Sequence, residues 1–304
     1  YDMRVKVTAP ASSANLGPGF DCLALALDLF NETSVATDAE AISITVTGEG
    51  AAALNGARGS LILNAMQRLY GEVKQPFPRG LRLECANGIP LGSGLGSSAC
   101  AAVSGLTVAN ALLGSPLSPQ KLLRLAFELE GHADNAAASL LGGMTLTIVE
   151  DGKPLARRQE LPALDWQIVV VLPAVTLSTR RARSVLPLQV PLQDAVFNAS
   201  RAALLVDALR GADFDAFRLA MTDRLHQPYR LGLIPGARSA LHTAQDMGAA
   251  AALSGAGPSL IAFCRTGVQE VAAAMRACFE REGVSTRLFF PHIALDGTRV
   301  EIIP

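Results

Sequence analysis

Residues 90 to 100 read Pro-Leu-Gly-Ser-Gly-Leu-Gly-Ser-Ser-Ala-Cys, an uncharged segment rich in glycine and serine. A strand-like run precedes it, and an alanine-rich, helix-like run follows. In such a context, backbone N–H groups and the dipole of a helix N-terminus can hold an anion such as phosphate. The segment therefore predicts a phosphate-binding loop that leads into a helix. On this segment alone, a flexible loop closing onto a tight helix is the alternative.

Two common phosphate loops are excluded by the residues that follow. A P-loop ends in Gly-Lys-Ser/Thr, but the next lysine here is Lys121. A dinucleotide-binding loop needs an acidic residue about 20 positions further on, and none occurs before Glu128. The loop therefore holds phosphate without either device.

Three further segments accompany this loop: Pro10-Ala-Ser-Ser-Ala-Asn-Leu-Gly-Pro-Gly-Phe-Asp21, Gly131-His-Ala-Asp-Asn135 and Ser254-Gly-Ala-Gly-Pro-Ser259. With residues 90–99 they run in order from residue 10 to residue 259, and together they resemble the GHMP small-molecule kinases, within them the homoserine kinase family. The resemblance implies ATP-dependent phosphorylation of the side-chain hydroxyl of L-homoserine to O-phospho-L-homoserine, a step of threonine biosynthesis. ATP and Mg²⁺ are the implied cofactors.

The resemblance also implies a fold. It is the two-domain α+β GHMP kinase fold, with a ribosomal S5 domain 2-like N-terminal domain over residues 1–160 and a ferredoxin-like C-terminal domain over residues 161–304. The active site would lie between the two domains.

A nucleotide and metal site follows from the same resemblance. Asn64 matches a position near the adenine, and Ser98 with a carboxylate of the next helix would hold Mg²⁺. Glu130 is the expected carboxylate and Glu128 the alternative. The implied nucleotide-binding residues are Asn64, Pro90, Leu91, Gly92, Ser93, Gly94, Leu95, Gly96, Ser97, Ser98, Ala99 and Cys100.

The implied amino-acid pocket needs partners for an ammonium and for a carboxylate. Asn15 and Asp21 suit the ammonium. Arg183 and Arg230 suit the carboxylate, because a guanidinium offers paired donors to two oxygens. His132 and Asn135 complete the implied substrate-binding residues.

The implied catalytic residues are Asn135, Thr179 and Arg183. An amide cannot act as a base at neutral pH, so Asn135 would orient the acceptor hydroxyl. Mg²⁺ and Thr179 would draw charge onto the γ-phosphate, and a phosphate oxygen would take the proton. Asp134, next in sequence, is the alternative base.

Two other functions stay open at this point. Another GHMP kinase acting on L-threonine or a sugar would share the ATP loop but not the pairing of Asn15 and Asp21 with Arg183 and Arg230. A nucleotide-binding regulator that has lost transfer should lack a metal carboxylate, and Glu130 argues against it.

The composition bounds these functions. The chain has 304 residues, 50% hydrophobic and 17% charged, which excludes disorder over most of its length. With a net charge of −1, the chain lacks the excess of basic residues that is typical of a nucleic-acid-binding protein. Small molecules are therefore the expected partners, and a homodimer is left open.

The expected location is the cytoplasm. The five cysteines never form C-x-x-C, so neither a disulfide framework nor a zinc site is suggested, and the N-terminus lacks the order of a signal peptide. Residues 85–120 are uncharged and long enough to span a bilayer. Their first half is rich in Gly, Ser, Pro and Asn, which argues against a membrane helix.

Hydrophobic periodicity predicts the elements that position these residues. Residues 150–162 are polar and are expected to connect the two domains. The predicted strands are residues 5–9, 42–47, 81–86, 145–149, 167–172 and 260–264, and the predicted helices are residues 60–70, 98–113, 117–129, 194–209, 214–225, 237–247 and 268–281.

Overall fold

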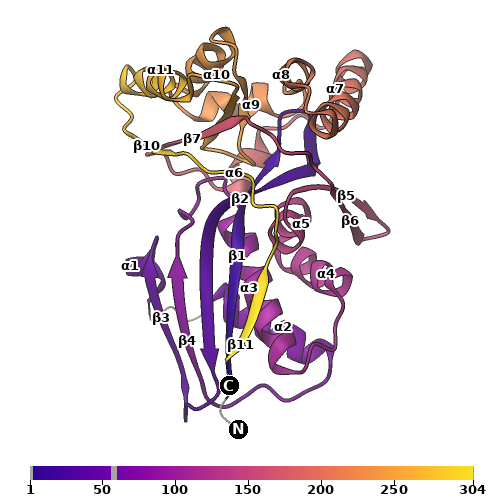
Figure 1. Cartoon of the computed structure of the whole chain (residues 1–304), viewed down its shortest axis with the longest axis vertical. Coiled ribbons are helices and arrows are strands. Elements are labelled where there is room, and N and C mark those ends of the chain that lie inside the picture. Colours follow the sequence, from indigo (N-terminus) through magenta and orange to yellow (C-terminus); the bar gives the residue numbers. More distant parts are fainter. Residues whose placement is uncertain (1–2, 56–59, 304) are drawn as a thin grey trace.

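The computed structural model describes residues 3–55 and 60–303, which form a seven-stranded and a four-stranded β sheet, each flanked by helices. In Figure 1 the long strands of the first sheet lie in a narrow lower part, and the second sheet and its helices make a wider upper part. The chain is therefore α+β, as predicted.

The first sheet has the strand order β11-β1-β2-β4-β3, with β5 paired to β2 and β6 paired to β5. Helices α2 to α5 lie along one face of it (Figure 1). The strands are β1 (Arg4–Asn15), β2 (Gly19–Ala36), β3 (Ile42–Gly48), β4 (Leu81–Asn87), β5 (Met144–Glu150), β6 (Lys153–Gln159) and β11 (Arg299–Ile303). The helices are α1 (Ala51–Leu54), α2 (Leu61–Glu72), α3 (Ser97–Leu112), α4 (Pro119–Glu130) and α5 (Asp134–Leu141).

Burial of α3 explains the uncharged stretch of the sequence. Nearly every residue of α3 from Ala99 to Ala111 is buried, because the helix is packed between the sheet and α2, α4 and α5. A helix covered on all sides has no face for charged residues. Within the residues described, no helix is both long and apolar enough to cross a bilayer.

The second sheet has the strand order β10-β7-β9-β8, all antiparallel, which is the ferredoxin-like arrangement. Along β7, Ile168 and Val170 face a core with α7 and α8, whereas Val169 and Val171 face a core with α10 and α11. The strands are β7 (Gln167–Pro173), β8 (Ala250–Leu253), β9 (Leu260–Cys264) and β10 (Thr286–Phe289). The helices are α6 (Thr179–Ser184), α7 (Leu192–Gly211), α8 (Phe214–Ala220), α9 (Gln227–Arg230), α10 (Ala237–Asp246) and α11 (Val268–Glu280), and a 3-10 turn, Leu231–Leu233, follows α9.

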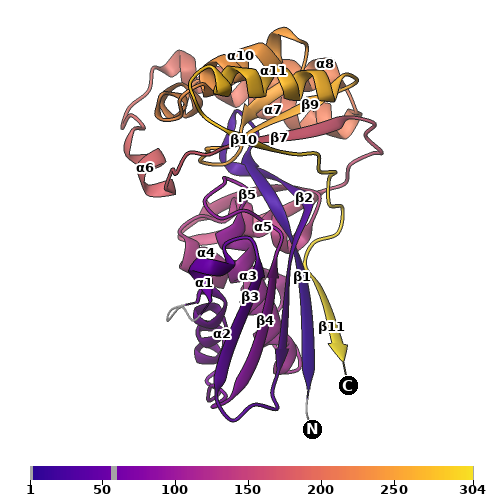
Figure 2. The ribbon, with the colours of Figure 1, turned by 90° about the vertical axis from the view of Figure 1, so that its left-hand side faces the viewer.

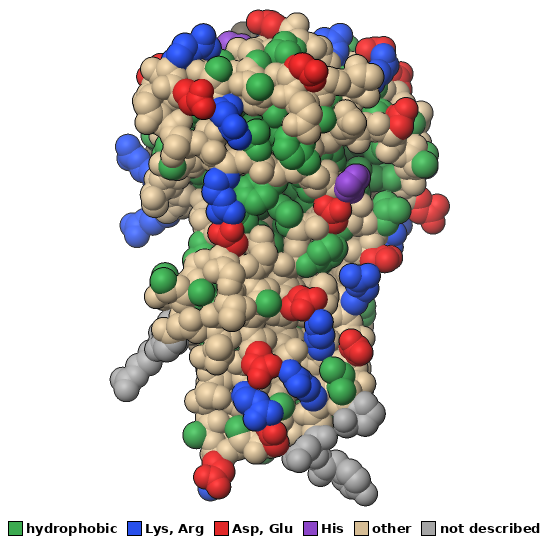
Figure 3. All heavy atoms as spheres, turned by 60° about the vertical axis from the view of Figure 1, so that its left-hand side comes forward, with side chains coloured by type: hydrophobic (Ala, Val, Ile, Leu, Met, Phe, Trp, Pro, Cys, Tyr) green, Lys and Arg blue, Asp and Glu red, His purple; other side chains and the backbone are tan. Residues whose placement is uncertain are grey.

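One of the hydrophobic clusters contains residues of both sheets. Leu16, which follows β1, and Leu23 of β2 belong to the same buried cluster as Phe217 of α8 and Met221 at its end. Figure 2 shows the upper ends of β1 and β2 reaching the second sheet. Figure 3 shows hydrophobic side chains gathered where the upper part meets the lower part. The turn between β1 and β2 is therefore held by residues of both parts.

The prediction that residues 150–162 are a polar connection is wrong over most of this segment. Residues 153–159 form β6, which pairs with β5 around a turn at Asp151-Gly152. Both turn residues have positive φ, 50° and 70°, the geometry for which Asp-Gly is favoured in hairpins. The chain passes to the second sheet only after Gln159, and β11 returns to pair with β1. A domain division at residue 160 stays a prediction.

Candidate active site

A cavity of about 320 Å³ lies between the two parts of the molecule. It brings together the glycine-rich loop, the start of α5, helix α6 and the segments containing Asn15 and Gly255. The predicted site residues that line it are Asn15, Asp21, Gly92, Ser93, Gly94, Gly96, Ser97, Ser98, Ala99, Glu130, His132, Asn135, Thr179, Arg183 and Arg230. Asn64, Pro90, Leu91, Leu95 and Cys100 do not line it.

The glycine-rich loop ends in a helix N-terminus that opens into the cavity. Gly96 is the N-cap of α3 with φ 70°, and no side-chain hydrogen bond caps the helix among the residues that the structure describes. Ser97, Ser98 and Ala99 of its first turn line the cavity. The first N–H groups of a helix have no partner within it and carry its positive dipole end. This geometry suits the predicted phosphate site.

Cys100 takes no direct part in this surface. Its side chain is fully buried, and its thiol lies 3.4 Å from the carbonyl oxygen of Ala9 in β1. Burial raises the pKa of Cys100 to about 12, so the thiol stays neutral. Cys100 therefore packs α3 against the sheet.

Backbone and hydroxyl contacts hold the glycine-rich loop on both sides. The N–H of Ser12 donates to Leu95 O at 3.0 Å, and Ser254 Oγ donates to Gly94 O at 2.8 Å. A Cβ on Gly94, which has φ 79°, would lie 2.4 Å from Ser254 O. The loop is thus fixed to the first and the last of the sequence motifs.

A hydroxyl and a carboxylate are hydrogen-bonded where the glycine-rich loop leads into α3. Ser98 Oγ donates to Glu130 Oε1 at 2.7 Å, and both residues line the cavity. Glu128 instead pairs with Arg68 at 2.6 Å. Among the residues described, no group of three or more His, Cys, Asp or Glu could hold a metal. Mg²⁺ is commonly held by one or two carboxylates together with phosphates, so Ser98 and Glu130 suit a metal bound with a nucleotide.

Asn15 is committed to fixing other parts of the site. Its side chain is buried, with Nδ2 donating to Gly255 O at 2.7 Å and Oδ1 accepting from the N–H of Asp21 at 3.1 Å. Asn15 and Asp21 both have positive φ, 73° and 57°. The amide therefore places the Asp21 carboxylate and the Gly255 turn relative to each other.

Asp21 and Arg183 form a two-pronged ion pair at the cavity. The guanidinium donates to both carboxylate oxygens, at 2.9 and 2.7 Å, and this bond with Asp21 raises the pKa of Arg183. Both side chains are more than one third exposed. An exposed pair contributes little stability, so its two ends can separate at small cost to receive a substrate with both charges.

Arg230 is buried at the back of the cavity, with 1% of its surface exposed. Its Nε donates to Ala182 O at 3.2 Å and its Nη1 contacts Gly255 O at 3.3 Å and His226 Nδ1 at 3.2 Å. Burial and then the Arg183 charge lower the pKa of Arg230 to about 10, so it is charged at neutral pH. A buried cation facing a cavity suits an anionic ligand group.

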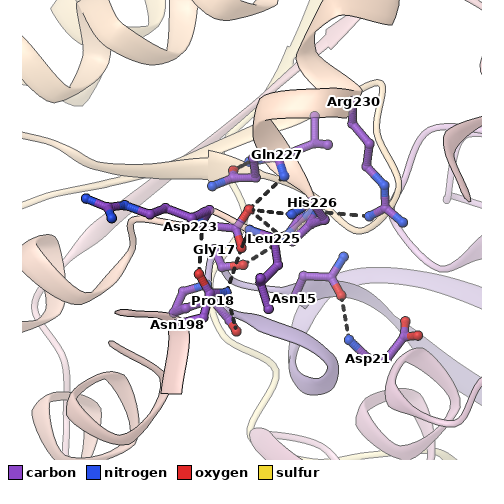
Figure 4. Close-up of polar contacts among 12 residues, drawn as sticks. Asn15, Gly17, Pro18, Asp21, Asn198, Asp223, Leu225, His226, Gln227 and Arg230 are labelled. Carbon is purple, nitrogen blue, oxygen red and sulfur yellow. Dashed lines mark hydrogen bonds and ion pairs between the residues drawn. The ribbon is translucent and has the colours of Figure 1, made fainter. Parts of the chain in front are cut away.

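Three polar residues that support Arg230 were not predicted from the sequence. Asp223 accepts from the N–H groups of Leu225, His226 and Gln227, and from Asn198 Nδ2 at 2.7 Å (Figure 4). His226 contacts Gly17 O with Nε2 at 2.7 Å. The Asp223-x-x-His spacing at the start of α9 was the available signal, since Asp commonly caps helix N-termini.

The contribution of His226 to the free energy of unfolding should fall as the pH is lowered below about 6.5, the ordinary pKa of histidine. Burial lowers the pKa of His226, so the unfolded chain takes up a proton there before the folded chain does. Asp134 raises the pKa of His132, which has the opposite effect. Urea unfolding of the wild type and of His226→Asn between about pH 7 and pH 5 isolates the first effect. The wild type should show the steeper loss, by at most about 1.4 kcal/mol per pH unit, and equal slopes would contradict it.

His132, Asp134 and Asn135 meet at the start of α5. His132 Nδ1 lies 3.2 Å from Asp134 Oδ1, and Asn135 Oδ1 accepts from Ser12 Oγ at 2.9 Å. The Asn135 amide NH₂ makes no hydrogen bond within the described parts of the chain. It is therefore the end of Asn135 that can contact a ligand, as a donor only.

The comparisons with known proteins agree with this geometry. The family "GHMP kinases N terminal domain" matches residues 60–143, and "GHMP kinases C terminal" matches residues 205–281. The fold and the site thus define a GHMP kinase, and the predicted fold class is confirmed.

Relatives narrow this class. The homoserine kinase of Moorella thermoacetica is 45% identical over 91% of this chain and 93% of its own, and that of a Synechococcus strain is 42% identical over 98% of both. The crystal structure of homoserine kinase from Cytophaga hutchinsonii has a TM-score of 0.86 at 30% identity, covering 98% of this chain and 97% of its own. The chain belongs to the homoserine kinase family.

Proposed function

We propose that the protein transfers the γ-phosphoryl group of ATP to the side-chain hydroxyl of L-homoserine and releases O-phospho-L-homoserine for threonine synthesis. One observation carries the proposal. A single cavity joins the N-terminus of α3, suited to phosphate, to the Asp21 carboxylate and the Arg183 and Arg230 guanidinium groups, suited to an amino acid. Homoserine carries an ammonium, a carboxylate and a hydroxyl, and each has a partner there.

The substrate replaces the internal ion pair. Asp21 accepts the ammonium, while Arg183 and the fixed Arg230 bind the carboxylate. Asn135 donates its NH₂ to the acceptor hydroxyl and aligns it with the γ-phosphate. The amide has no basic atom, so the hydroxyl proton passes to a γ-phosphate oxygen as the new O–P bond forms and ADP leaves.

The nucleotide lies along residues 90–99, and Thr179 at the start of α6 contacts the γ-phosphate from the opposite side. Ser98 and Glu130 would hold Mg²⁺, which supplies positive charge to the phosphate oxygens when bound. The chain belongs to the GHMP kinases, which are ATP-dependent phosphotransferases, and this supports ATP as the nucleotide at the loop.

An ADP-release assay over L-homoserine, L-threonine, L-serine, mevalonate and galactose tests the proposed function. L-Homoserine should give the highest kcat/KM. Greater turnover with mevalonate or galactose would replace the proposal with a different GHMP kinase activity. Binding of ATP with no turnover of any acceptor would instead indicate a regulator.

Asn135→Ala should lower kcat about 10- to 100-fold with a small change in KM for ATP, because the donor that aligns the hydroxyl is lost. The variant also loses the hydrogen bond between Ser12 and Asn135. Asp134→Ala is the matched comparison, since Asp134 also lines the cavity. Steady-state kinetics of both variants decide between orientation and general base catalysis. If only Asp134→Ala abolished turnover while both substrates still bound, Asp134 would be the base.

A further inference from the structure

His226 is fully buried beneath the proposed carboxylate site and makes contacts with both ring nitrogens (Figure 4). Nε2 lies 2.7 Å from Gly17 O, and Nδ1 lies 3.2 Å from Arg230 Nη1. The ring also stacks on Phe20, with ring centroids 5.1 Å apart. The residue thus touches the β1–β2 turn and the buried arginine at once.

The partners fix the roles of both nitrogens. A carbonyl oxygen can only accept, so Nε2 carries the proton and donates to Gly17. A guanidinium can only donate, so Nδ1 is unprotonated and accepts from Arg230. One neutral tautomer alone satisfies both contacts, and a protonated ring would set a donor against a donor.

Arg230 depends on this acceptor for its direction. Its Nε is bound by Ala182 O, and Nη1 is shared between Gly255 O and His226 Nδ1. Within residues 3–55 and 60–303, Nη2 makes no hydrogen bond, and Arg230 lines the cavity. The three bound donors hold the guanidinium plane so that Nη2 is left for a ligand.

Asp223 fixes the position of His226. Its carboxylate accepts the N–H of His226 at 2.9 Å, and its Oδ2 lies 3.7 Å from His226 Nε2. Asn198 connects Asp223 to Pro18 O at 3.3 Å. The turn at Gly17-Pro18, the start of α9 and Arg230 are therefore parts of one network.

We propose that His226 is a positioning residue for substrate recognition, which aims Arg230 at the amino-acid carboxylate by accepting its hydrogen bond in the Nε2–H tautomer. This rests on the proposed function, in which Arg230 binds that carboxylate. His226 does not touch substrate, and its effect passes through Arg230.

Two substitutions separate the two nitrogens. His226→Gln can still offer an N–H near the Nε2 position but has no acceptor at the Nδ1 position, whereas His226→Asn keeps an acceptor near Nδ1. His226→Gln should raise KM for homoserine about tenfold, and His226→Asn should raise it less. KM for ATP should change less than about twofold in both, because the hydrogen bonds of this ring among the described residues go to Gly17 and Arg230 and not to residues 90–100.

A double-variant cycle distinguishes positioning from a general loss of structure. In an Arg230→Lys background, His226→Gln should cause no further rise in KM for homoserine, because the bond it removes is already lost. The proposal would be overturned if the rise in KM for homoserine in the double variant equalled the product of the two single rises. Equal rises in KM for both substrates would also overturn it.

A measurement on the unaltered protein keeps the proposal testable if a variant fails to fold. Nitrogen-15 NMR should show His226 neutral, with the proton on Nε2, at neutral pH. The Nδ1–H tautomer or a charged ring would overturn it. If Arg230→Lys leaves KM for homoserine unchanged, the proposed function fails. If Arg230→Lys raises KM and His226→Gln does not, only the role of His226 fails.

Discussion

Glu130→Gln is expected to lower kcat about 100-fold or more at saturating ATP and homoserine. The substitution removes the charge of the carboxylate that accepts a hydrogen bond from Ser98, in the first turn of α3. A neutral amide is a poor ligand for Mg²⁺, so more Mg²⁺ should be needed for half-maximal rate. Initial rates over a Mg²⁺ titration, at fixed ATP, measure both effects.

Glu128→Gln is the matched control, because it makes the same change two residues earlier in α4. Glu128 pairs with Arg68 and lies outside the cavity, so this variant should keep kcat and its Mg²⁺ dependence. An equal loss in the two variants, or a full rate in Glu130→Gln, would contradict the assignment of Glu130.

Gly96→Ala should abolish turnover while the protein still folds. Gly96 has φ 70°, and a Cβ there would lie 2.2 Å from Ser12 Oγ and 3.1 Å from Asn135 Oδ1. The new methyl group must push apart the Ser12–Asn135 hydrogen bond and displace the N-cap of α3. Both the proposed phosphate site and Asn135, proposed to align the hydroxyl, would therefore move. Rates and calorimetric ATP binding measure the loss.

Gly114→Ala provides the comparison at the other end of α3. Gly114 also has positive φ, 75°, but a Cβ there meets nothing within 4 Å. Gly114→Ala should lose about 1 kcal/mol of stability from the strained backbone conformation, and Gly96→Ala should lose more because of its close contacts. Only Gly96→Ala should lose activity. Comparable activity in the two variants would show that the contact with Ser12 and Asn135 is unimportant.

Much of the fold could be predicted because local patterns specify it. The signal Ser118-Pro119 marks the start of α4, and left-handed Gly131 marks its end. β2 was not predicted, since Leu23–Leu27 in this strand are all buried and no simple alternation of buried and exposed residues results. β6 was mistaken for a connection because polar residues on an edge strand resemble a loop.

Residues of the candidate site could be predicted where they belong to sequence motifs. They could not be predicted where their role depends on tertiary contacts. Asp21, Arg183 and Arg230 belong to motifs, and the structure brings them to one cavity. The structural role of Asn15 depends on Gly255, 240 residues away, and no local pattern reveals such a partner. The hydrogen bond between Asp223, in the segment between α8 and α9, and Asn198 of α7 likewise joins parts of the chain that no local pattern connects.

Hydrogen bonds join the first strand of the chain to the last strand, and the first sequence motif to the last motif. β1 pairs with β11, and Asn15 donates to Gly255. A nascent chain emerging from the ribosome N-terminus first must therefore wait for the last third of its sequence before the β1–β2 turn gains these partners. Until then the glycine-rich loop lacks its hydrogen bond from Ser254, and Asn15 lacks its partner Gly255. Kinase competence is thus acquired at the end of synthesis, and C-terminally truncated products should be inactive.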